Sequence, residues 1–193
     1  MPKKLIFMIG APGSGKSTYS DKINEMHPED IDSIHVGDLL RDEVEQGTTI
    51  GKIVGMYIEK GDLVPGEVII YEVFGRIRKS SKSIVLMDGF PRGLNQMKIL
   101  ADALIYDKGI ELLSIIELKV SRDVARQRLL PEGFTEDEEA LFEHKMETYE
   151  SLIGKIEKFY EDKGLLTVID AQRDQDQVLQ DIDNYLKKLV ELY

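Results

Sequence analysis

A glycine-rich stretch near the start of the chain has the residue types and spacing that hold a polyphosphate. It runs from Gly10 to Thr18 and reads GAPGSGKST. An apolar run, LIFMI, precedes it and a segment with helical character follows, which is the strand–turn–helix context of a phosphate-binding loop. Glycines let main-chain N–H groups point at an anion, and the helix start adds its positive dipole end. The alternative, a glycine-rich turn beside a solvated lysine, does not require this fixed spacing.

The side chains of this loop have separate tasks in such chemistry. Lys16 is long enough to reach the outer phosphates of a nucleoside triphosphate, and the Ser17 hydroxyl has the position to bind Mg²⁺. We therefore expect a nucleotide and its Mg²⁺ at the loop. The residues expected to contact the nucleotide there are Gly13, Ser14, Gly15, Lys16, Ser17 and Thr18.

Charged residues also follow two other apolar runs. Asp88 follows the run at 83–87, and beside a phosphate loop a carboxylate at a strand end holds Mg²⁺ or one of its waters. Its alternative role is to cap the next turn. Arg92 comes four residues after Asp88, and Arg41 comes three after Asp38. The two arginines either clamp a second phosphate through paired hydrogen bonds or are ordinary solvated helix-surface residues, and position alone does not separate these interpretations.

Apolar periodicity predicts the elements that position these side chains. Apolar runs predict buried strands at 5–9, 33–36, 83–87, 112–118 and 165–169. Helices are expected at 19–26, 39–46, 50–60, 67–79, 94–106, 122–130, 136–163 and 175–191, with Asp38 as the N-cap of the second. This alternation predicts an α/β fold, a doubly wound five-stranded parallel sheet of the P-loop type. Ligands of such sheets bind beyond the carboxyl ends of the strands.

Two short segments interrupt this core pattern. Residues 37–66 hold two short helices between the second strand and a longer helix, which indicates a small helical insert at the sheet edge. Residues 131–136 form a short connector before a long helix with one apolar stripe. We therefore expect a core domain made of 1–36, 67–130 and 137–193. Both small parts, the insert and a lid at 131–136, are expected to move when ligands bind.

Composition excludes several classes of protein. The 193 residues suffice for one α/β domain with an insert, and the formal net charge of −11 argues against nucleic acid, whose binders are usually basic. The absence of cysteine excludes disulfides and thiolate metal sites. No apolar run is long enough to span a membrane, and the start MPKK leads directly into a strand rather than a signal peptide. We expect a cytoplasmic protein that binds neither nucleic acid nor membrane.

Four motifs, in this order and spacing, resemble the adenylate kinase family of nucleoside monophosphate kinases. They are GAPGSGKST at 10–18, GDLLR at 37–41, GDLVP at 61–65 and DGFPR at 88–92 with Gln96. The similarity extends through ETY at 147–149 and IDA at 169–171, hence over nearly the whole chain. It implies a monomer with a monophosphate-binding insert and a lid. The implied reaction is reversible Mg²⁺-dependent phosphoryl transfer, ATP + AMP = 2 ADP.

The resemblance also implies roles for individual residues. The cations around the moving phosphoryl group are Lys16, Arg41, Arg92 and Arg128, so the protein needs no catalytic acid or nucleophile. ATP is implied to contact Arg128 and Arg173 besides the loop, and Mg²⁺ is implied at Ser17 and Asp88. The residues implied for AMP are Gly37, Arg41, Asp62, Leu63, Val64, Gly89, Phe90, Arg92, Gln96 and Lys145.

Two of these residues also support the assignment by their own chemistry. The Gln96 amide pairs with a donor and an acceptor on one adenine edge, whereas pyrimidine monophosphate kinases of similar pattern tend to carry asparagine nearby. Lys145 stands where the family has an arginine. It lies three residues after Phe142 and four before Tyr149, hence on the apolar stripe of its helix. A cation there needs an anion, which is either a bound phosphate or an internal carboxylate.

The lid and the second strand depart from the family pattern. The family's lid usually carries arginines that close on the phosphates, whereas 130–139 reads LPEGFTEDEE, and a capping box from Thr135 to Glu138 accounts only for its acids. Glu132 and Phe134 stand about where the arginines are expected. Either Arg122 or Arg126 substitutes from the preceding helix, or the chain is a slow kinase. In addition, His35-Val36 replaces a pair of small hydroxyl residues, which removes one contact to the base.

Three functions follow from these features. The motifs favour an adenylate kinase, and the first alternative is a UMP- or CMP-type nucleoside monophosphate kinase. The second alternative is a nucleotide-binding module with weakened catalysis that acts through partners. Comparing AMP, UMP and CMP as acceptors separates the two kinases, and the module predicts ATP binding without acceptor-dependent formation of ADP.

Overall fold

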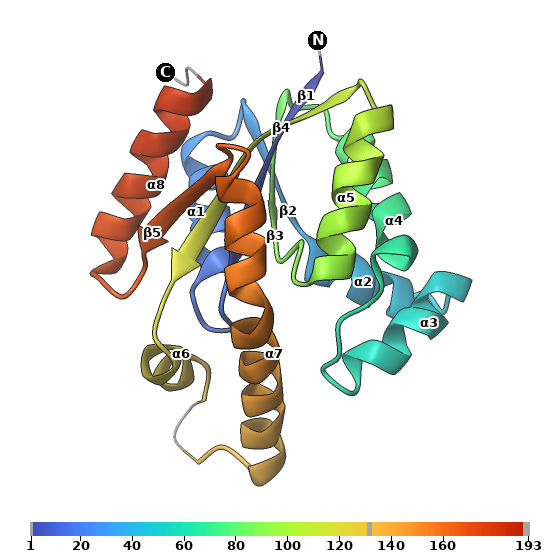
Figure 1. Ribbon diagram of the computed structural model, residues 1–193, viewed down its shortest axis with the longest axis vertical. Coiled ribbons are helices and arrows are strands. Elements are labelled where there is room, and N and C mark those ends of the chain that lie inside the picture. The colour runs from blue at the N-terminus through green and yellow to red at the C-terminus, as the bar shows by residue number, and fades with distance from the viewer. Residues whose placement is uncertain (1, 131–132, 191–193) are drawn as a thin grey trace.

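A computed structural model describes residues 2–130 and 133–190, and shows a parallel sheet with helices on both faces (Figure 1). The strands are β1 (Lys3–Gly10), β2 (Ile31–His35), β3 (Ile84–Asp88), β4 (Ile110–Lys119) and β5 (Leu166–Asp170). The helices are α1 (Lys16–Met26), α2 (Val36–Glu45), α3 (Thr49–Ile58), α4 (Gly66–Lys79), α5 (Leu94–Tyr106), α6 (Arg122–Leu129), α7 (Glu136–Glu161) and α8 (Gln175–Val190). The predicted α/β class and five-stranded sheet are confirmed.

The strands are ordered β2-β3-β1-β4-β5 and every neighbouring pair is parallel. Parallel pairing brings all carboxyl ends to one edge of the sheet. At that edge Gly10 lies opposite Leu118, and His35 lies opposite Asp88 in the ladder. The start of the phosphate loop and two titratable side chains are therefore neighbours, although they are far apart in the sequence.

Each strand buries residues on both faces, which explains the continuous apolar runs. In β1, Leu5, Phe7 and Ile9 belong to one buried cluster, while Ile6 and Met8 belong to the other. The first cluster also takes residues from α4, α5 and the second half of α7, and the other takes residues from α1 and α8. Figure 1 shows these two layers, with α1 and α8 on one side of the sheet and α4 and α5 on the other.

The long helix α7 joins the sheet to the region beyond the carboxyl ends of the strands. Its later residues Ile156 and Tyr160 pack in the first cluster, and its earlier residues Phe142 and Met146 pack in the second. In Figure 1 the first turns of α7 and the short helix α6 extend past the sheet, and α2 and α3 occupy the other side of the same end. No helix in the described part of the chain is long and apolar enough to cross a membrane.

The structure corrects two helix starts in the insert. Helix α2 begins at Val36 with His35 as its N-cap, so Val36 does not end the strand and Asp38 is not the cap. Val36 is 2% exposed, and a buried apolar residue fits the end of a strand and the first turn of a helix equally well. Helix α4 has Pro65 as its N-cap and Gly66 as its first residue, whose N–H donates to Asn95.

The segment around the expected lid is described only in part. The expected capping box is confirmed, because Thr135 Oγ1 accepts from the Glu138 N–H while the Glu138 side chain accepts from the Thr135 N–H. Two lid positions, 131 and 132, lie outside the described residues, as does position 191 at the end of the last helix.

Candidate active site

The loop between β1 and α1 adopts a conformation that only glycine tolerates at two positions. Gly13 and Gly15 have φ of 78° and 90°, and a Cβ on Gly13 would lie 2.6 Å from the Ala125 carbonyl oxygen. Gly15 is the N-cap of α1 and supplies no side-chain cap. The first N–H groups of α1 therefore lack a capping side chain, which is the arrangement in which a helix start binds an anion.

Lys16 folds back over this loop. Its ammonium group donates to the carbonyl oxygens of Gly10 and Ala11 at 2.9 and 2.8 Å and to Ser14 Oγ at 3.2 Å. Burial, with Arg92 nearby, lowers the pKa of Lys16 to about 7, and the Asp88 carboxylate opposes this only in part. The ammonium group is thus short of negative charge, which a bound polyphosphate would supply.

Asp88 and Ser17, the two predicted Mg²⁺ ligands, lie together beside the loop. Burial opposes ionisation of Asp88, but contacts with His35 and Ser17 outweigh it and hold the pKa of Asp88 below its usual range. Asp88 Oδ2 is buried, and its neighbour is the Nδ1 atom of His35 at 3.0 Å. An ionised carboxylate next to a hydroxyl is a donor set that suits a hard cation such as Mg²⁺. The residues therefore fit this metal.

His35 is a site residue that the sequence analysis did not assign to the chemistry. Its Nδ1 lies 3.0 Å from Asp88 Oδ2 and its Nε2 lies 2.7 Å from Asp21 Oδ1. Contact with Asp88 raises the pKa of His35 to about 9, against the effect of burial and with help from Asp21. The strand prediction contained a usable signal, since a residue ending β2 must lie near a residue ending a neighbouring parallel strand.

A cavity of about 370 Å³ opens from the loop toward the insert. Cations from four parts of the chain line it: Lys16 at the end of the loop, Arg41 from α2, Arg92 from the segment after β3, and Lys145 from α7. Arg92 is held by its Nε donating to the Gly89 carbonyl at 2.6 Å, and burial and Arg41 lower its pKa despite Asp88. Arg41 is exposed and pairs with Asp38.

Lys145 differs from the sequence-based expectation. It is exposed overall rather than part of the apolar stripe, although its side chain reaches the cavity wall beside Thr148. Burial of its ammonium group lowers the pKa of Lys145, and the charges that add to this effect are Arg92 and Arg41. No carboxylate contributes to the shift. An internal carboxylate partner is thus not seen among the described residues, and the binding of a phosphate to Lys145 stays a prediction.

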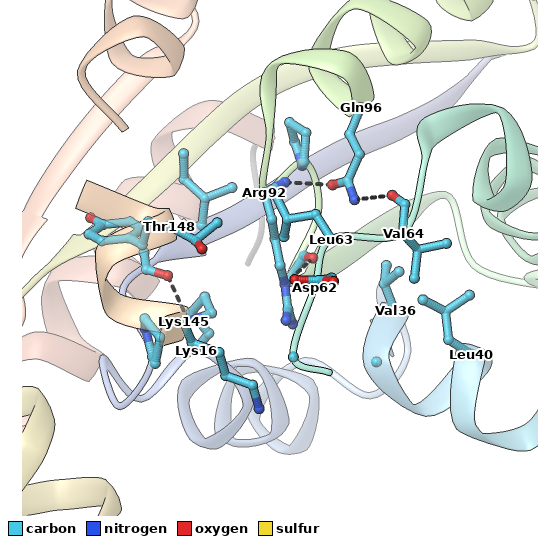
Figure 2. A pocket seen from close by; sticks show the side chains of 18 of the residues that line it. Lys16, Val36, Leu40, Asp62, Leu63, Val64, Arg92, Gln96, Lys145 and Thr148 are labelled. Atoms are coloured by element: carbon cyan, nitrogen blue, oxygen red, sulfur yellow. Dashed lines mark hydrogen bonds between the residues drawn. The ribbon is translucent and has the colours of Figure 1, made fainter. Parts of the chain in front are cut away.

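The far end of the cavity has apolar walls around one buried amide. Figure 2 shows Gln96 between two main-chain groups: its Oε1 accepts from the Arg92 N–H at 2.7 Å, and its Nε2 donates to the Val64 carbonyl at 2.8 Å. These bonds fix the orientation of the amide and leave one N–H and one lone pair free. The other cavity residues there are Val36, Leu40, Asp62, Leu63, Val64 and Ile69.

Several residues expected at the ligands lie away from the cavity wall. Phe90 is fully buried with its ring 5.5 Å from that of Phe7, so only its main chain is available, whereas Gly89 and Gly37 line the cavity. In the loop, Gly13 and Ser17 line the cavity, Ser14 is buried beneath Lys16, and Gly15 and Thr18 do not reach the cavity wall.

The two arginines expected at ATP lie outside this cavity. Arg128 donates to the Ala171 carbonyl at 2.9 Å, and Arg173 pairs with Asp181 at 2.5 Å. Both are close enough to Tyr19, the first buried residue of α1, to lower its pKa, although burial keeps that pKa raised. They therefore flank the start of α1 next to the phosphate loop, and their contact with a nucleotide stays a prediction.

The two arginines considered as substitutes for the missing lid arginines are engaged elsewhere. Arg122 donates to Glu143 and to both oxygens of Glu150, at distances from 2.6 to 3.2 Å. Arg126 pairs with Glu139 and lies 4.9 Å over the ring of Phe134. Three glutamates of α7 and the ring of Phe134 thus occupy these two guanidinium groups.

A phosphate loop opposite a second cationic pocket defines a class. Loops of this kind bind nucleoside triphosphates, and a second anion site facing the loop distinguishes a P-loop kinase, which must hold an acceptor, from a hydrolase. Comparison with known proteins agrees. A family model described as adenylate kinase matches residues 8–165. The chain belongs to the adenylate kinase family.

Individual relatives match over almost their whole length. The adenylate kinase of Campylobacter concisus is 40% identical over 189 residues, which cover 97% of this chain and 100% of the relative. That of Sulfurovum sp. is 39% identical over 192 residues, covering 95% and 98%. That of Nautilia profundicola is 39% identical over 187 residues, covering 96% and 97%.

Proposed function

We propose that this protein transfers a phosphoryl group reversibly from Mg²⁺-bound ATP to AMP, ATP + AMP = 2 ADP. The observation that carries the proposal is the single cavity in which Lys16 of the phosphate loop faces Arg92, Arg41 and Lys145. Two phosphate groups that react with each other must be held in one space, and cations from both sides neutralise the charge of the moving group.

The residues of this cavity have distinct tasks in the proposed reaction. Lys16 exchanges its loop carbonyl partners for the outer phosphates of ATP, which returns its pKa toward the ordinary value. Arg92 is already held by the Gly89 carbonyl, so it loses little freedom when it binds the acceptor phosphate. Arg41 must exchange Asp38 for that phosphate. Lys145 adds positive charge from the other wall.

Base selection is proposed to depend on Gln96. Its amide is fixed by the Arg92 N–H and the Val64 carbonyl, which leaves one donor and one acceptor for an adenine edge. Because the Arg92 main chain is one of these partners, the base and phosphate sites share a support. Val36 contributes an apolar contact where the family usually offers a hydroxyl.

Mg²⁺ is proposed to lie at Ser17 and Asp88. When bound, it would neutralise charge on the phosphates of ATP. The donor side is completed in this proposal by Arg128 and Arg173 next to Tyr19.

The domain division proposed here has a core of 1–36, 67–130 and 137–193, an acceptor insert at 37–66 and a lid at 131–136. The Gly61 turn of the insert already contacts α7, where a Cβ would lie 2.5 Å from Leu141. His144 and Asp62 add a polar contact of 2.9 Å between the same two parts. A monomeric state and a cytoplasmic location stay predictions, which gel filtration with light scattering and cell fractionation test.

The deciding experiment measures ADP formation by ³¹P NMR with Mg²⁺-bound ATP and, in separate samples, AMP, UMP, CMP and GMP. We expect ADP from AMP at a rate well above the other acceptors, and loss of the reaction in Lys16→Met. The matched control is Lys108→Met, which removes a lysine from a different surface depression. A preference for UMP or CMP, or ATP binding without acceptor-dependent ADP, would overturn the proposal.

A further inference from the structure

The imidazole of His35 makes contacts that the proposed reaction does not use. Nδ1 lies 3.0 Å from Asp88 Oδ2, and Nε2 lies 2.7 Å from Asp21 Oδ1. The three side chains come from β2, β3 and α1, and Asp21 lies four residues after Ser17 on the same helix. The His35 side chain is 19% exposed and that of Asp88 is 4% exposed, so the inner contact is largely shielded from water.

His35 also has a special position along the chain. It is the last residue of β2 and the N-cap of α2, the first helix of the acceptor insert. Its main chain therefore marks the point where the insert leaves the core, while its side chain contacts the carboxylate at the metal side of the cavity. A shift of the insert at this point would change the contact with Asp88.

The Asp88 carboxylate is contacted by two side chains, and the second contact matters for its orientation. Ser17 contacts the carboxylate from the loop side and His35 contacts it from the β2 side. The terminal torsion of an aspartate is broad, so one contact leaves the plane of the carboxylate free to turn. Two contacts from different elements fix that plane, as the outer partners of metal-binding carboxylates do in other proteins.

We propose that His35 is a positioning residue that sets the orientation of the Asp88 carboxylate toward the metal and links that orientation to the insert that binds the acceptor. This inference rests on the proposed role of Asp88 at Mg²⁺. It predicts that a change at His35 that breaks the contact with Asp88 alters metal coordination and the KM for the acceptor together.

Two amide substitutions separate the inner from the outer contact. In His35→Asn the amide nitrogen falls near the position of Nδ1, so the contact with Asp88 is kept, whereas in His35→Gln it falls near Nε2, so only the contact with Asp21 is kept. Asp21→Asn weakens the outer contact alone. Thermal unfolding of all three variants checks that each is folded.

The direct readout is the electron paramagnetic resonance spectrum of Mn²⁺ bound with a non-hydrolysable ATP analogue, which reports ligand geometry without turnover. We expect the wild-type line shape in His35→Asn and Asp21→Asn. In His35→Gln we expect a changed line shape and Mn²⁺ binding weaker by about 10-fold. In steady-state assays the same variant should raise the KM for AMP together with the Mg²⁺ requirement.

A wild-type spectrum and unchanged KM in His35→Gln would overturn the inference, as would equal losses in the Asn and Gln variants. Asp88→Asn separates this failure from failure of the proposed metal site. If Asp88→Asn leaves the Mn²⁺ spectrum unchanged, Asp88 is not at the metal and both proposals fail. If Asp88→Asn changes the spectrum and His35→Gln does not, only the role of His35 is wrong.

Discussion

Arg92 on the acceptor side and the two arginines on the lid side of this protein have different surroundings. On the acceptor side, Arg92 donates to a carbonyl group, and the charges that shift the pKa of Lys145 are those of two arginines. On the lid side, Arg122 bonds two glutamates and Arg126 pairs with a third. Arg41 on the acceptor side also pairs with an acid, Asp38, so the contrast among the described arginines is between Arg92, which has no ion pair, and the two lid-side arginines, which pair with glutamates.

This difference shows that the number of arginines near a site does not tell how many positive charges are free to bind a ligand there. In a chain with a formal net charge of −11, a guanidinium group near a helix surface readily finds a carboxylate. Arg92 forms no ion pair among the described residues, because the carboxylate whose charge it feels, that of Asp88, is already in contact with His35 and Ser17. The surroundings of a cation in the folded protein, more than its position in the sequence, keep it free for phosphate.

The largest expected effect is on the acceptor side. Arg92→Ala should lower kcat/KM for AMP by about 10³-fold, because a preorganised donor to the reacting phosphate is lost. The measurement is a coupled assay of ADP formation over a range of AMP concentrations. Arg78→Ala is the matched control, since Arg78 is exposed and pairs with Asp107 away from the cavity. A loss of kcat/KM below about 10-fold would show that Arg92 is no more available to a ligand than the lid-side arginines are.

The second prediction concerns a buried contact that holds α7 against the sheet. Helix α7 carries both Lys145 and the glutamates of the lid side. Glu117 is fully buried and accepts from the Tyr149 hydroxyl at 2.9 Å. Burial and the neighbouring Glu157 raise the pKa of Glu117 from 4.5 to about 7. Between these two values the folded state keeps a proton on Glu117 that the unfolded chain releases. Glu117 therefore contributes its full stabilisation below about pH 4.5, and this stabilisation is lost as the pH rises to about 7.

Urea unfolding at pH 5 and pH 7.5 measures this effect. The free energy of unfolding should fall between these values by an amount on the order of 3 kcal/mol. Glu117→Gln should remove most of the dependence, because an amide cannot lose the proton. Burial opposes ionisation of Glu157, but contacts with Lys119 and Glu117 outweigh it and lower the pKa of Glu157. Glu157 therefore makes stability rise with pH, and it is not changed in the Glu117→Gln variant. An unchanged pH dependence in the variant would show that Glu117 ionises normally.

The third prediction tests whether the packing of the two insert helices shapes the acceptor pocket. A Cβ on Gly51 would lie 1.9 Å from the Glu43 carbonyl oxygen, so Gly51→Ala must push α3 away from α2. We expect the KM for AMP to rise by about 10-fold with kcat little changed, because the pocket walls move while the loop does not. Gly55→Ala is the control: its Cβ would meet Val44 at an ordinary 3.8 Å. Equal KM values in both variants would contradict the prediction.

The smallest effects are expected on the lid side. Arg122→Ala and Arg126→Ala should each change kcat by less than about 3-fold, because their guanidinium groups are occupied by glutamates. Initial rates at saturating ATP and AMP provide the measurement. A loss of kcat above about 10-fold in either variant would mean that its ion pairs open during the reaction and that it substitutes for a lid arginine.

The sequence by itself determined the fold class, the phosphate loop and the pairing of Ser17 with Asp88. These features follow from local chemistry: continuous apolar runs predict strands buried on both faces, and only glycine tolerates positive φ at Gly13 and Gly15. Motif spacing also located Arg92 and Gln96, which both line the cavity. The start of α2 was placed too late, because an apolar residue such as Val36 fits two local structures.

Tertiary structure alone decided which charged groups are free and which are paired. Arg122 meets Glu143 and Glu150 through the packing of α6 against α7, and His35 meets Asp88 through the register of β2 with β3. Such contacts join residues far apart in the chain, so neither periodicity nor motif spacing reports them. The physical reason is that the charge available to a ligand depends on burial and on the nearest opposite charge, and both are set only when the elements pack together.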